Sequence, residues 1–593
     1  MSDIRLIVNT IRYMTFRQWK YRILYTIRDR IIKRHPCRCL NIIDVIPLSL
    51  NYKNNLLKFE SLKNANKLLD NSFVTVSGIV KSFGEDIDWD LKNENYRLAV
   101  FKLNSFRYLL DLSDAYKVSK DKKYINKGFE LIDKWWNSNG TIIEGDKWNP
   151  YVIAERLMNW IGFCSEYCGT MGRNIFKYAR YIYQQAVELR KTIEYQLGAN
   201  HLLSEGKALL ICGAFLKNNG LYRYGKKLLL NEYKEQFFSD GGHYERSISY
   251  HIESLQQYFE GIAVMTIIKD AEMQDFIKMI KPAYQYLYGM IQVNGEIPLF
   301  NDSAKDYPFE SAAGFISTGD LLYSASIPDL KKGDYYYRWN WIKCQKESIK
   351  WTAQEYYPET GYLHHRFCVG KENYSLLFDV GNGGPDSNMG HTHADALSVI
   401  LANSSKEILV DSGVYTYKPG NERTECRSTK AHNTVEVDGM NSCEIWSAFR
   451  VAKRGHTIVT RYSNENGQLS ISAVHDGYCK CLKTAVTHER TISKNASCIE
   501  IQDKLIGKNR HNVIARFHIG RDCKTKIKSR KECLINNLIL IKCSEAMYLT
   551  ECEIAEYFGL KEKTKCIEIP LSFSDKGLIK TQIMINNSEE KND

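Results

Sequence analysis

Three histidines and two carboxylates lie close together in a strand-like stretch of the second half of the chain. They are His391, His393, Asp395, Asp411 and His432. Alternate side chains of a strand share a face, so the first three can line one surface. Two imidazoles, with a carboxylate and a third imidazole from neighbouring strands, suit a His-Asp-His metal site that leaves one histidine for chemistry. The alternative is a buried polar cluster that satisfies its own hydrogen bonds. The set as a whole favours metal binding plus catalysis.

A second group of chemically capable residues lies in the first half. His201 and Glu205 are four residues apart, so on a helix they face the same way, and the Asn200 carboxamide can donate to a carboxylate. Further along, the turn signal Asp240-Gly-Gly precedes Tyr250-His251. A Tyr-His pair by itself is more typical of packing than of catalysis.

Aromatic and cationic residues lie near this group in the sequence. Trp148 and Tyr151 offer flat faces on which a sugar can stack, and Arg156 can pair with an acid group of that sugar.

The pattern from about residue 91 to 345 predicts consecutive helices. Apolar residues recur every three or four positions, and Gly, Asn or Pro clusters interrupt them. Short connections predict antiparallel hairpins, either stacked in a solenoid or closed into a toroid. The predicted helices are Tyr96–Tyr116, Ile125–Trp136, Tyr151–Tyr167, Asn174–Leu197, Ser204–Phe215, Gly220–Phe238, Ile248–Met265 and Phe276–Met290.

After about residue 350 the apolar period changes to two, which predicts an antiparallel β-sandwich. The predicted strands include Leu397–Leu401, Glu407–Val410, Thr434–Asp438, Thr457–Thr460, Leu469–Val474, Cys498–Gln502, Asn512–Ile519 and Asn537–Lys542. The whole is an α+β multidomain chain, with a lead-in over 1–90, a helical domain over 91–345 and a β domain over 346–593.

Composition limits the classes of partner and compartment. At 593 residues the chain is too long for one core, and its net charge of +12 favours an anionic partner, although no nucleic-acid motif is present. The 17 cysteines form no C-x-x-C pair, which favours free thiols in a reducing compartment. We find no export signal and no long apolar run, so we expect a cytoplasmic protein.

The first 35 residues predict a basic amphipathic helix. Nine Lys and Arg residues are interspersed with an apolar stripe made of Ile4, Val8, Ile11, Trp19, Ile23, Ile27 and Ile31. Such a helix could lie on an anionic membrane. The commoner arrangement, and the one we expect, buries the stripe against the rest of the same protein.

The order of these motifs resembles a known family. The segments Asn200–Glu205, Asp240–His251, His391–Asp395, Asp411–Tyr417 and Arg427–Thr434 follow the pattern of heparinase II/III-like polysaccharide lyases. The resemblance extends from about Asp88 into the β module. It implies an (α/α) toroid followed by a C-terminal antiparallel β-sandwich, with the active site in a cleft between them.

The resemblance also implies a reaction, β-elimination at a uronic acid of an anionic polysaccharide. Asn200 and His201 would neutralise the sugar carboxylate, because donors aimed at developing negative charge lower the barrier most. Tyr250 would act foremost as the proton donor, a role that needs no lowering of its ordinary pKa of about 10. His391 would be the base, and Tyr417 is a weaker base candidate.

The remaining site residues bind substrate or metal in this interpretation. The family's structural zinc implies Zn²⁺ held by His393, Asp411 and His432, with Mn²⁺ as an alternative and Asp395 orienting an imidazole. The predicted substrate-binding residues are Trp148, Tyr151, Arg156, Glu205, Arg246, Arg423 and Arg427.

Other functions stay open at this point. A C5-uronyl epimerase begins with the same proton abstraction, and a non-catalytic carbohydrate-binding scaffold or a metal-dependent hydrolase are further alternatives. The lack of an export signal and the basic first helix favour a role in bacterial capsule or exopolysaccharide metabolism. The lyase hypothesis requires Asn200, His201 and Tyr250 to converge with His391 across one groove.

Overall fold

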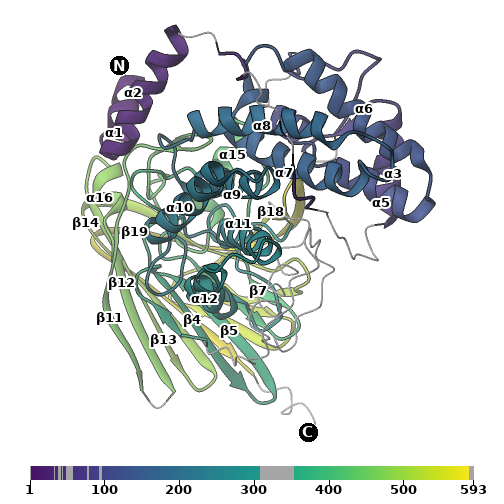
Figure 1. Cartoon of the computed structure of the whole chain (residues 1–593). Helices are drawn as coiled ribbons and strands as arrows, with labels where there is room; N and C mark the ends of the chain where they lie inside the picture. The colour runs from purple at the N-terminus through teal and green to yellow at the C-terminus, as the bar shows by residue number, and fades with distance from the viewer. Residues whose placement is uncertain are drawn as a thin grey trace.

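The structure is a computed structural model that describes residues 2–31, 34–37, 42, 44–48, 58–76, 79–92, 97–306, 353–465 and 467–586. Helices occupy the first half of the described chain and antiparallel sheets the second (Figure 1). This order confirms the predicted α+β fold class. The predicted domain boundary at residues 345/346 lies outside the described residues.

Helices of the first half begin where short polar side chains cap them. Asn149, Asn174, Asn218 and Ser247 each accept a hydrogen bond from a backbone N–H of the first turn. The helices are α4 (Arg97–Ser105), α5 (Leu109–Ser119), α6 (Lys122–Asn139), α7 (Pro150–Tyr167), α8 (Ile175–Lys191), α9 (Ala199–Phe215), α10 (Asn219–Gln236), α11 (Ile248–Ile267) and α12 (Met273–Met290).

Helices α9 and α11 lie deepest in this half. Every residue of α9 is buried except His201, and α11 is buried over nearly its whole length. Leu203, Leu210 and Ile262 are among the residues without exposed surface in a core that all the helices share. The two helices that carry the predicted catalytic residues are therefore the best supported by packing.

Three predictions for the helical half need correction. The helix predicted over Tyr96–Tyr116 is two helices, because Phe106 between α4 and α5 takes a left-handed conformation with φ of 61°. The single N-terminal helix is also two, α1 (Ser2–Ile11) and α2 (Phe16–Ile31), and five residues of its apolar stripe are exposed rather than buried, namely Ile4, Val8, Trp19, Ile23 and Ile27. The lead-in also contains α3 (Lys58–Leu69) and a hairpin of β1 (Ser72–Val74) and β2 (Val80–Ser82).

The β half consists of two large antiparallel sheets. The smaller has the order β3-β4-β5-β6-β7, and the larger runs β11-β12-β13-β14-β19-β17-β16-β15, with β8 paired to β14 and β18 to β19. Leu363 and Leu376 of the small sheet share a core with Ile471, Ile501 and Ile583 of the large one, as in a sandwich.

The strands of the smaller sheet are β3 (Tyr356–Tyr357), β4 (Tyr362–Val369), β5 (Glu372–Asp379), β6 (Val399–Asn403) and β7 (Glu407–Leu409). Those of the larger sheet are β8 (Val435–Val437), β11 (Thr457–Glu465), β12 (Gln468–His475), β13 (Val486–Asn495), β14 (Cys498–His518), β15 (Thr525–Ser529), β16 (Glu532–Ile535), β17 (Ile539–Cys543), β18 (Tyr548–Tyr557) and β19 (Leu560–Ile585). The short hairpin β9 (Ile445–Ser447) and β10 (Arg450–Val451) lies outside both sheets.

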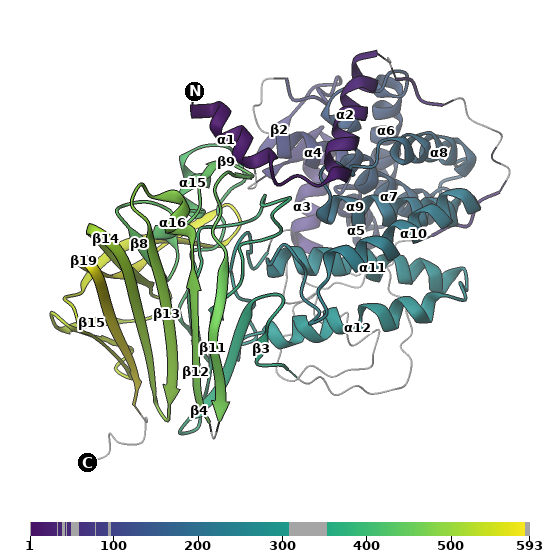
Figure 2. The same ribbon diagram turned by 90° about the vertical axis from the view of Figure 1, so that its left-hand side faces the viewer.

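The helical half and the sheets lie side by side in Figure 2, and polar contacts fasten one to the other. Lys305 pairs with Glu407 of β7 at 2.6 Å and with Glu556 of β18 at 3.0 Å. The Asp240 carboxylate, in the α10–α11 loop, accepts hydrogen bonds from the backbone N–H and the hydroxyl of Thr360 at 2.8 and 2.6 Å. Within the described residues, no helix combines the length and apolar character needed to cross a bilayer.

Candidate active site

Tyr250 and His391 meet at the junction of the two halves. Tyr250 lies in the first turn of α11, and His391 lies in the loop between β5 and β6. Their rings stack with centroids 3.7 Å apart, and the Tyr250 hydroxyl is 3.0 Å from the hydroxyl of Tyr417. Three groups able to move protons therefore converge from distant parts of the chain.

The α11 N-terminus is tied to the segment that follows α12. The hydroxyl of the cap residue Ser247 accepts from the N–H of Tyr250 at 3.3 Å and donates to the carbonyl of Asp302 at 2.8 Å. The N–H of Asp302 in turn donates to the carbonyl of His391 at 3.1 Å. Backbone contacts thus hold Tyr250 and His391 in register across the junction.

Asp302 organises the imidazoles. Its fully buried carboxylate bonds with His391 Nδ1 at 2.9 Å and His393 Nε2 at 2.8 Å, and the Arg423 guanidinium grips both oxygens. Burial alone would raise the pKa of Asp302, but Arg423 and the two imidazoles hold it well below its usual value. A charged Asp302 accepts the Nδ1–H of His391 and leaves Nε2 as the basic nitrogen.

The basic nitrogen of His391 faces a second buried carboxyl. Glu245 Oε1 lies 3.7 Å from His391 Nε2, and neither Glu245 oxygen has a hydrogen-bond partner in the part of the chain that the structure describes. Burial, with the charges of Glu253 and Asp302, raises the pKa of Glu245 well above its usual value. Burial lowers the pKa of His391 despite Asp302. A neutral imidazole therefore stands opposite a carboxyl that resists ionisation.

Asn200 and His201 occupy the first turn of α9, where the helix dipole favours negative charge. The Asn200 amide donates to Glu253 Oε1 at 3.1 Å, and the Tyr151 hydroxyl donates to the same oxygen at 3.2 Å. His201 Nδ1 lies 2.6 Å from Glu194 Oε2. Glu253 is three residues from Tyr250 on α11, which places this group beside the Tyr250 group.

The predicted convergence of Asn200, His201, Tyr250 and His391 thus has a geometric basis, while their catalytic roles stay predictions. One detail differs from the expectation. The segment from His391 to Asp395 is irregular rather than a strand, and β6 begins only at Val399. His391 and His393 share a side because both bond to Asp302, not because side chains alternate along a strand.

The predicted metal ligands lie together beyond Asp302. His432 Nδ1 is 2.8 Å from Asp411 Oδ2, and the rings of His393 and His432 are 5.2 Å apart. His393 Nδ1 is buried without a partner while its Nε2 bonds to Asp302, the arrangement usual for a metal-binding imidazole. These donors fit Zn²⁺, although no group of three among the described residues already stands close enough to hold an ion.

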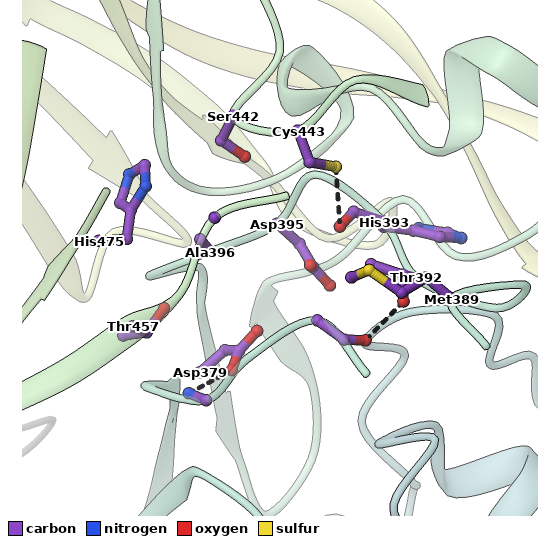
Figure 3. A pocket seen from close by; sticks show the side chains of 13 residues that line it. Asp379, Met389, Thr392, His393, Asp395, Ala396, Ser442, Cys443, Thr457 and His475 are labelled. Carbon is purple, nitrogen blue, oxygen red and sulfur yellow. Dashed lines mark hydrogen bonds between the residues drawn. The ribbon is translucent and has the colours of Figure 1, made fainter. Parts of the chain in front are cut away.

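A polar pocket lies on the other side of the His393 backbone, between the smaller sheet and the 442–457 region. Figure 3 shows the carboxylates of Asp379 and Asp395 pointing into this space, whereas the His393 ring extends away from it. Asp395 accepts from the N–H of Asn301 at 3.3 Å. The carboxylate that orients an imidazole is therefore Asp302, not Asp395 as expected.

Several predicted substrate-binding residues lie in the interior. Trp148 is 2% exposed, and Arg156, with no exposed surface, donates to Gln185 and to the carbonyls of Asn104 and Lys147. Arg427 is equally buried and donates only to backbone carbonyls. These placements favour structural roles, because a guanidinium without exposed surface cannot reach a sugar.

Three others hold the site together. Glu205 is fully buried and accepts from the N–H of Glu194 at 2.9 Å. Arg246 donates to the carbonyls of Thr360 and Glu359, which lie across the junction. Arg423 is committed to Asp302 and lies 4.9 Å from the Tyr417 ring centre. Tyr151 lies beside a predicted catalytic residue, with its ring 4.7 Å from that of His201 and tilted by 34° to it.

The sequence interpretation missed Asp302, Glu245, Glu253 and Phe449. Glu245 lay inside a motif singled out for other residues, and Asp302 lay in the polar run Asn301-Asp302-Ser303, whose position after an apolar segment was the available signal. Phe449 packs 5.9 Å from His391 and 5.3 Å from Tyr417. It carried no signal, because an isolated aromatic residue is ordinary.

Comparison with protein families gives two matches that together span most of the chain. A model described as "Heparinase II/III N-terminus" matches residues 33–313, and one described as "Heparinase II/III-like, C-terminal" matches residues 352–572. The first contains Asn200 and Tyr250, and the second contains His391 and the predicted metal ligands.

Individual relatives are distant. The chain is 22% identical to a heparin-sulfate lyase of Bacteroides stercoris, in an alignment of 80% of this chain and 72% of that protein. It is also 22% identical to one of Bacteroides thetaiotaomicron, over 61% of this chain and 55% of the relative. A crystal structure of heparinase III matches with a TM-score of 0.72 at 15% identity, covering 98% of this chain and 94% of that one. The shared fold is a helical toroid followed by a β-sandwich.

Proposed function

The chain belongs to the heparinase II/III-like family, and from that premise we propose that it is a polysaccharide lyase that cleaves a uronate-containing, glycosaminoglycan-type chain by β-elimination. The observation that carries the proposal is the contact of Tyr250 with both His391 and Tyr417 at the junction of the two halves. Binding alone does not require a stacked base and proton donor at one point.

The first task is to stabilise negative charge on the sugar carboxylate as the C5 proton leaves. Asn200 and His201 serve it from the first turn of α9, where side-chain donors and the helix N-terminus act together. Glu253 and Glu194 hold the two side chains in place before substrate arrives. Preorganised donors of this kind avoid the cost of reorientation during the reaction.

The second task is proton transfer. His391 removes the C5 proton through Nε2, because Asp302 occupies Nδ1 and stabilises the imidazolium that forms. Tyr250 donates a proton to the departing O4, which breaks the C4–O4 bond and leaves a C4–C5 double bond in the product. Tyr417, hydrogen-bonded to Tyr250, then relays a proton from solvent to the Tyr250 phenolate, and the His391 imidazolium releases the C5 proton to solvent, which restores both groups.

We further propose a structural Zn²⁺ held by His393, Asp411 and His432. The support is the orphaned, buried His393 Nδ1 beside the Asp411–His432 pair. Bound there, the ion would supply positive charge that fixes the loop between β5 and β6. His391 itself needs no contact with it, since Asp302 already orients its ring.

The decisive substitution is Tyr250→Phe. It removes the hydroxyl and keeps the ring that stacks on His391, so we expect the fold to persist and turnover to fall by about 10²- to 10⁴-fold. Turnover is followed as ultraviolet absorbance of the unsaturated uronate during incubation with heparan sulfate, chondroitin sulfate, hyaluronan and alginate.

The control is Tyr258→Phe, two turns further along α11. Its hydroxyl donates to the carbonyl of Leu229 at 3.0 Å, so its loss costs about 1 kcal/mol of stability and leaves turnover unchanged. Full turnover in Tyr250→Phe would remove this residue from the mechanism. Deuterium uptake at C5 without absorbance would indicate an epimerase, and sugar binding without either would indicate a scaffold.

The role in capsule or exopolysaccharide metabolism rests on the basic N-terminal residues and stays a prediction. Including capsular polysaccharides of the producing bacterium in the substrate panel tests it directly.

A further inference from the structure

The two N-terminal helices present an apolar surface to solvent. On α2, Phe16 is 83% exposed, Ile23 54% and Ile27 50%, and their spacing of seven and four residues puts them on one face. Ile4 and Val8 of α1 are 68% and 52% exposed. Large apolar side chains gathered in this way mark an interaction site more often than isolated ones do.

The opposite face of the same helices is polar and holds them to the protein. Thr10 Oγ1 accepts from the Trp446 indole at 3.0 Å, the Gln18 amide donates to the carbonyl of Ser387 at 3.2 Å, and the Tyr25 hydroxyl donates to the carbonyl of Ile193 at 2.7 Å. Arg17 pairs with Glu232 at 3.1 Å. The helices are therefore fixed with their apolar side outward, the reverse of an ordinary surface helix.

The charge of this region identifies the kind of surface that covers it. Nine Lys and Arg residues fall within the first 35 positions against two acidic ones, and Arg12 and Lys20 are exposed beside the apolar stripe. Apolar and aromatic side chains bordered by cations match the boundary between the headgroups and acyl chains of an anionic bilayer. A symmetric contact with a second copy would instead set these cations against each other, in a chain of net charge +12.

We propose that α1 and α2 dock this protein on the surface of an anionic membrane, with Phe16, Ile23 and Ile27 inserted below the headgroups. The helices lie at the left margin of the molecule in Figure 1 and on the side that faces the viewer in Figure 2, so a flat surface can approach them.

The docking surface adjoins the catalytic region. Thr10 of α1 contacts Trp446 of the β9–β10 hairpin, and Phe449 at the turn of that hairpin packs against His391. One hairpin therefore links the membrane-facing helix to the proposed base. Docking would hold the site close to the bilayer, where a membrane-attached polysaccharide is presented.

Vesicle co-sedimentation tests the proposal with the full chain. We expect it to pellet with vesicles of phosphatidylcholine and phosphatidylglycerol, to bind phosphatidylcholine alone at least about tenfold more weakly, and to lose binding as NaCl rises. The triple variant Phe16→Ser, Ile23→Ser, Ile27→Ser should bind the anionic vesicles at least about tenfold more weakly, with its melting temperature unchanged because all three side chains are exposed.

A matched variant controls for the loss of apolar surface in general. Ile458→Ser, Ile506→Ser, Leu578→Ser removes three exposed apolar side chains from the large sheet and should leave vesicle binding unchanged. The proposal is overturned when the unmodified chain stays in the supernatant, or when the N-terminal triple variant binds as well as it does. It is also overturned if the unmodified chain is a dimer, the N-terminal triple variant is a monomer, and neither protein binds vesicles. In that case a second copy of the chain covers the surface. None of these outcomes depends on lyase activity.

Discussion

At the scale of single residues, the protonation state of Glu253, which accepts a hydrogen bond from Asn200, makes the stability of the protein depend on pH. Burial raises its pKa to about 6, although Asn200 and Tyr151 donate to it. The unfolded chain releases this proton near pH 4.5, so between about pH 4.5 and 6 the folded state binds more protons and stability falls as pH rises. At pH 8 the charge is fully present in both states and costs the folded protein about 2 kcal/mol, at 1.36 kcal/mol per pKa unit.

The substitution Glu253→Gln removes this charge and keeps an oxygen that can accept from Asn200 and Tyr151. We expect it to raise the free energy of unfolding by about 2 kcal/mol at pH 8 and by less than about 1 kcal/mol at pH 5. Urea denaturation at both pH values measures the difference. The exposed Glu425→Gln serves as control and should change little at either pH. An equal gain at both values for Glu253→Gln would mean that the carboxyl titrates normally.

The sequence predicted candidate site residues where a motif contained them, but it did not predict which residues would contact them. Asn200, His201, Tyr250 and His391 were singled out by type and spacing, and they lie at one junction. Asp302 was not, although it bonds to two of the predicted histidines, because the chain brings it there from about ninety positions away. Arg156 and Arg427 looked suited to anions, yet both are buried and donate to backbone carbonyls of the interior, which no local pattern reveals.

At the scale of elements, the α10–α11 loop positions Tyr250 and leaves no room at Gly242. A Cβ there would lie 1.8 Å from Thr360 Oγ1, and that hydroxyl is itself held by Asp240 at 2.6 Å. Gly242→Ala must therefore displace the contact that ties this loop to the residues before β4. We expect the free energy of unfolding to fall by about 1–3 kcal/mol. Turnover should fall as well, because α11, which carries Tyr250, begins six residues after Gly242.

Gly169→Ala is the matched control for this prediction. Nothing lies within 4 Å of a Cβ at Gly169, and its backbone needs no left-handed conformation, so the change should stay within about 0.5 kcal/mol. Guanidinium denaturation of the two variants compares them. Equal stability would show that Thr360 moves aside at no cost and that the loop does not depend on it.

Helices were predicted more completely than strands for a physical reason. Each helix satisfies its own backbone, so its period and caps are local, as in α7 and α11. Strand pairing is not local. The strands predicted over Cys498–Gln502 and Asn512–Ile519 are one strand, β14, with a register shift between Gly507 and Arg510 opposite β19. Strands β4, β5, β13 and β19 were not singled out from the sequence, because their partners rather than their own sequences define them.

At the scale of the whole molecule, the site exists only because two halves meet. The segment after α12 supplies Asp302 to histidines of the β half, and Lys305 three residues later pairs with both sheets. The order of helices and strands along the chain predicted the architecture. The order of the motifs predicted that the helices carrying Asn200 and Tyr250 would face the segment carrying His391. The bridging segment could not be predicted, since its residues acquire a role only once both halves are in place.

The predicted metal belongs to this scale, because one of its ligands, His393, shares Asp302 with the junction. If Zn²⁺ is bound, the purified protein should contain one ion per chain. Removal by a chelator should then lower the free energy of unfolding by about 3–4 kcal/mol, the gain expected when free metal stands about 100- to 1,000-fold above its Kd. Metal analysis and thermal unfolding with and without chelator measure both quantities.

Two variants give this prediction its sharpest form. His393→Ala removes a ligand, so its melting temperature should be low and indifferent to chelator. His511→Ala removes a buried imidazole of β14 that pairs with Asp438 at 2.6 Å. His511 lies far along the chain from the predicted ligands. The variant should be destabilised and still respond to chelator, because its metal site is intact. A structural ion further requires that turnover and melting temperature decline together. Loss of turnover on chelation with no change in melting temperature would assign the ion to catalysis. If the purified protein contains no metal and its melting temperature does not respond to chelator, the prediction is wrong, and a water molecule would explain the buried Nδ1 of His393.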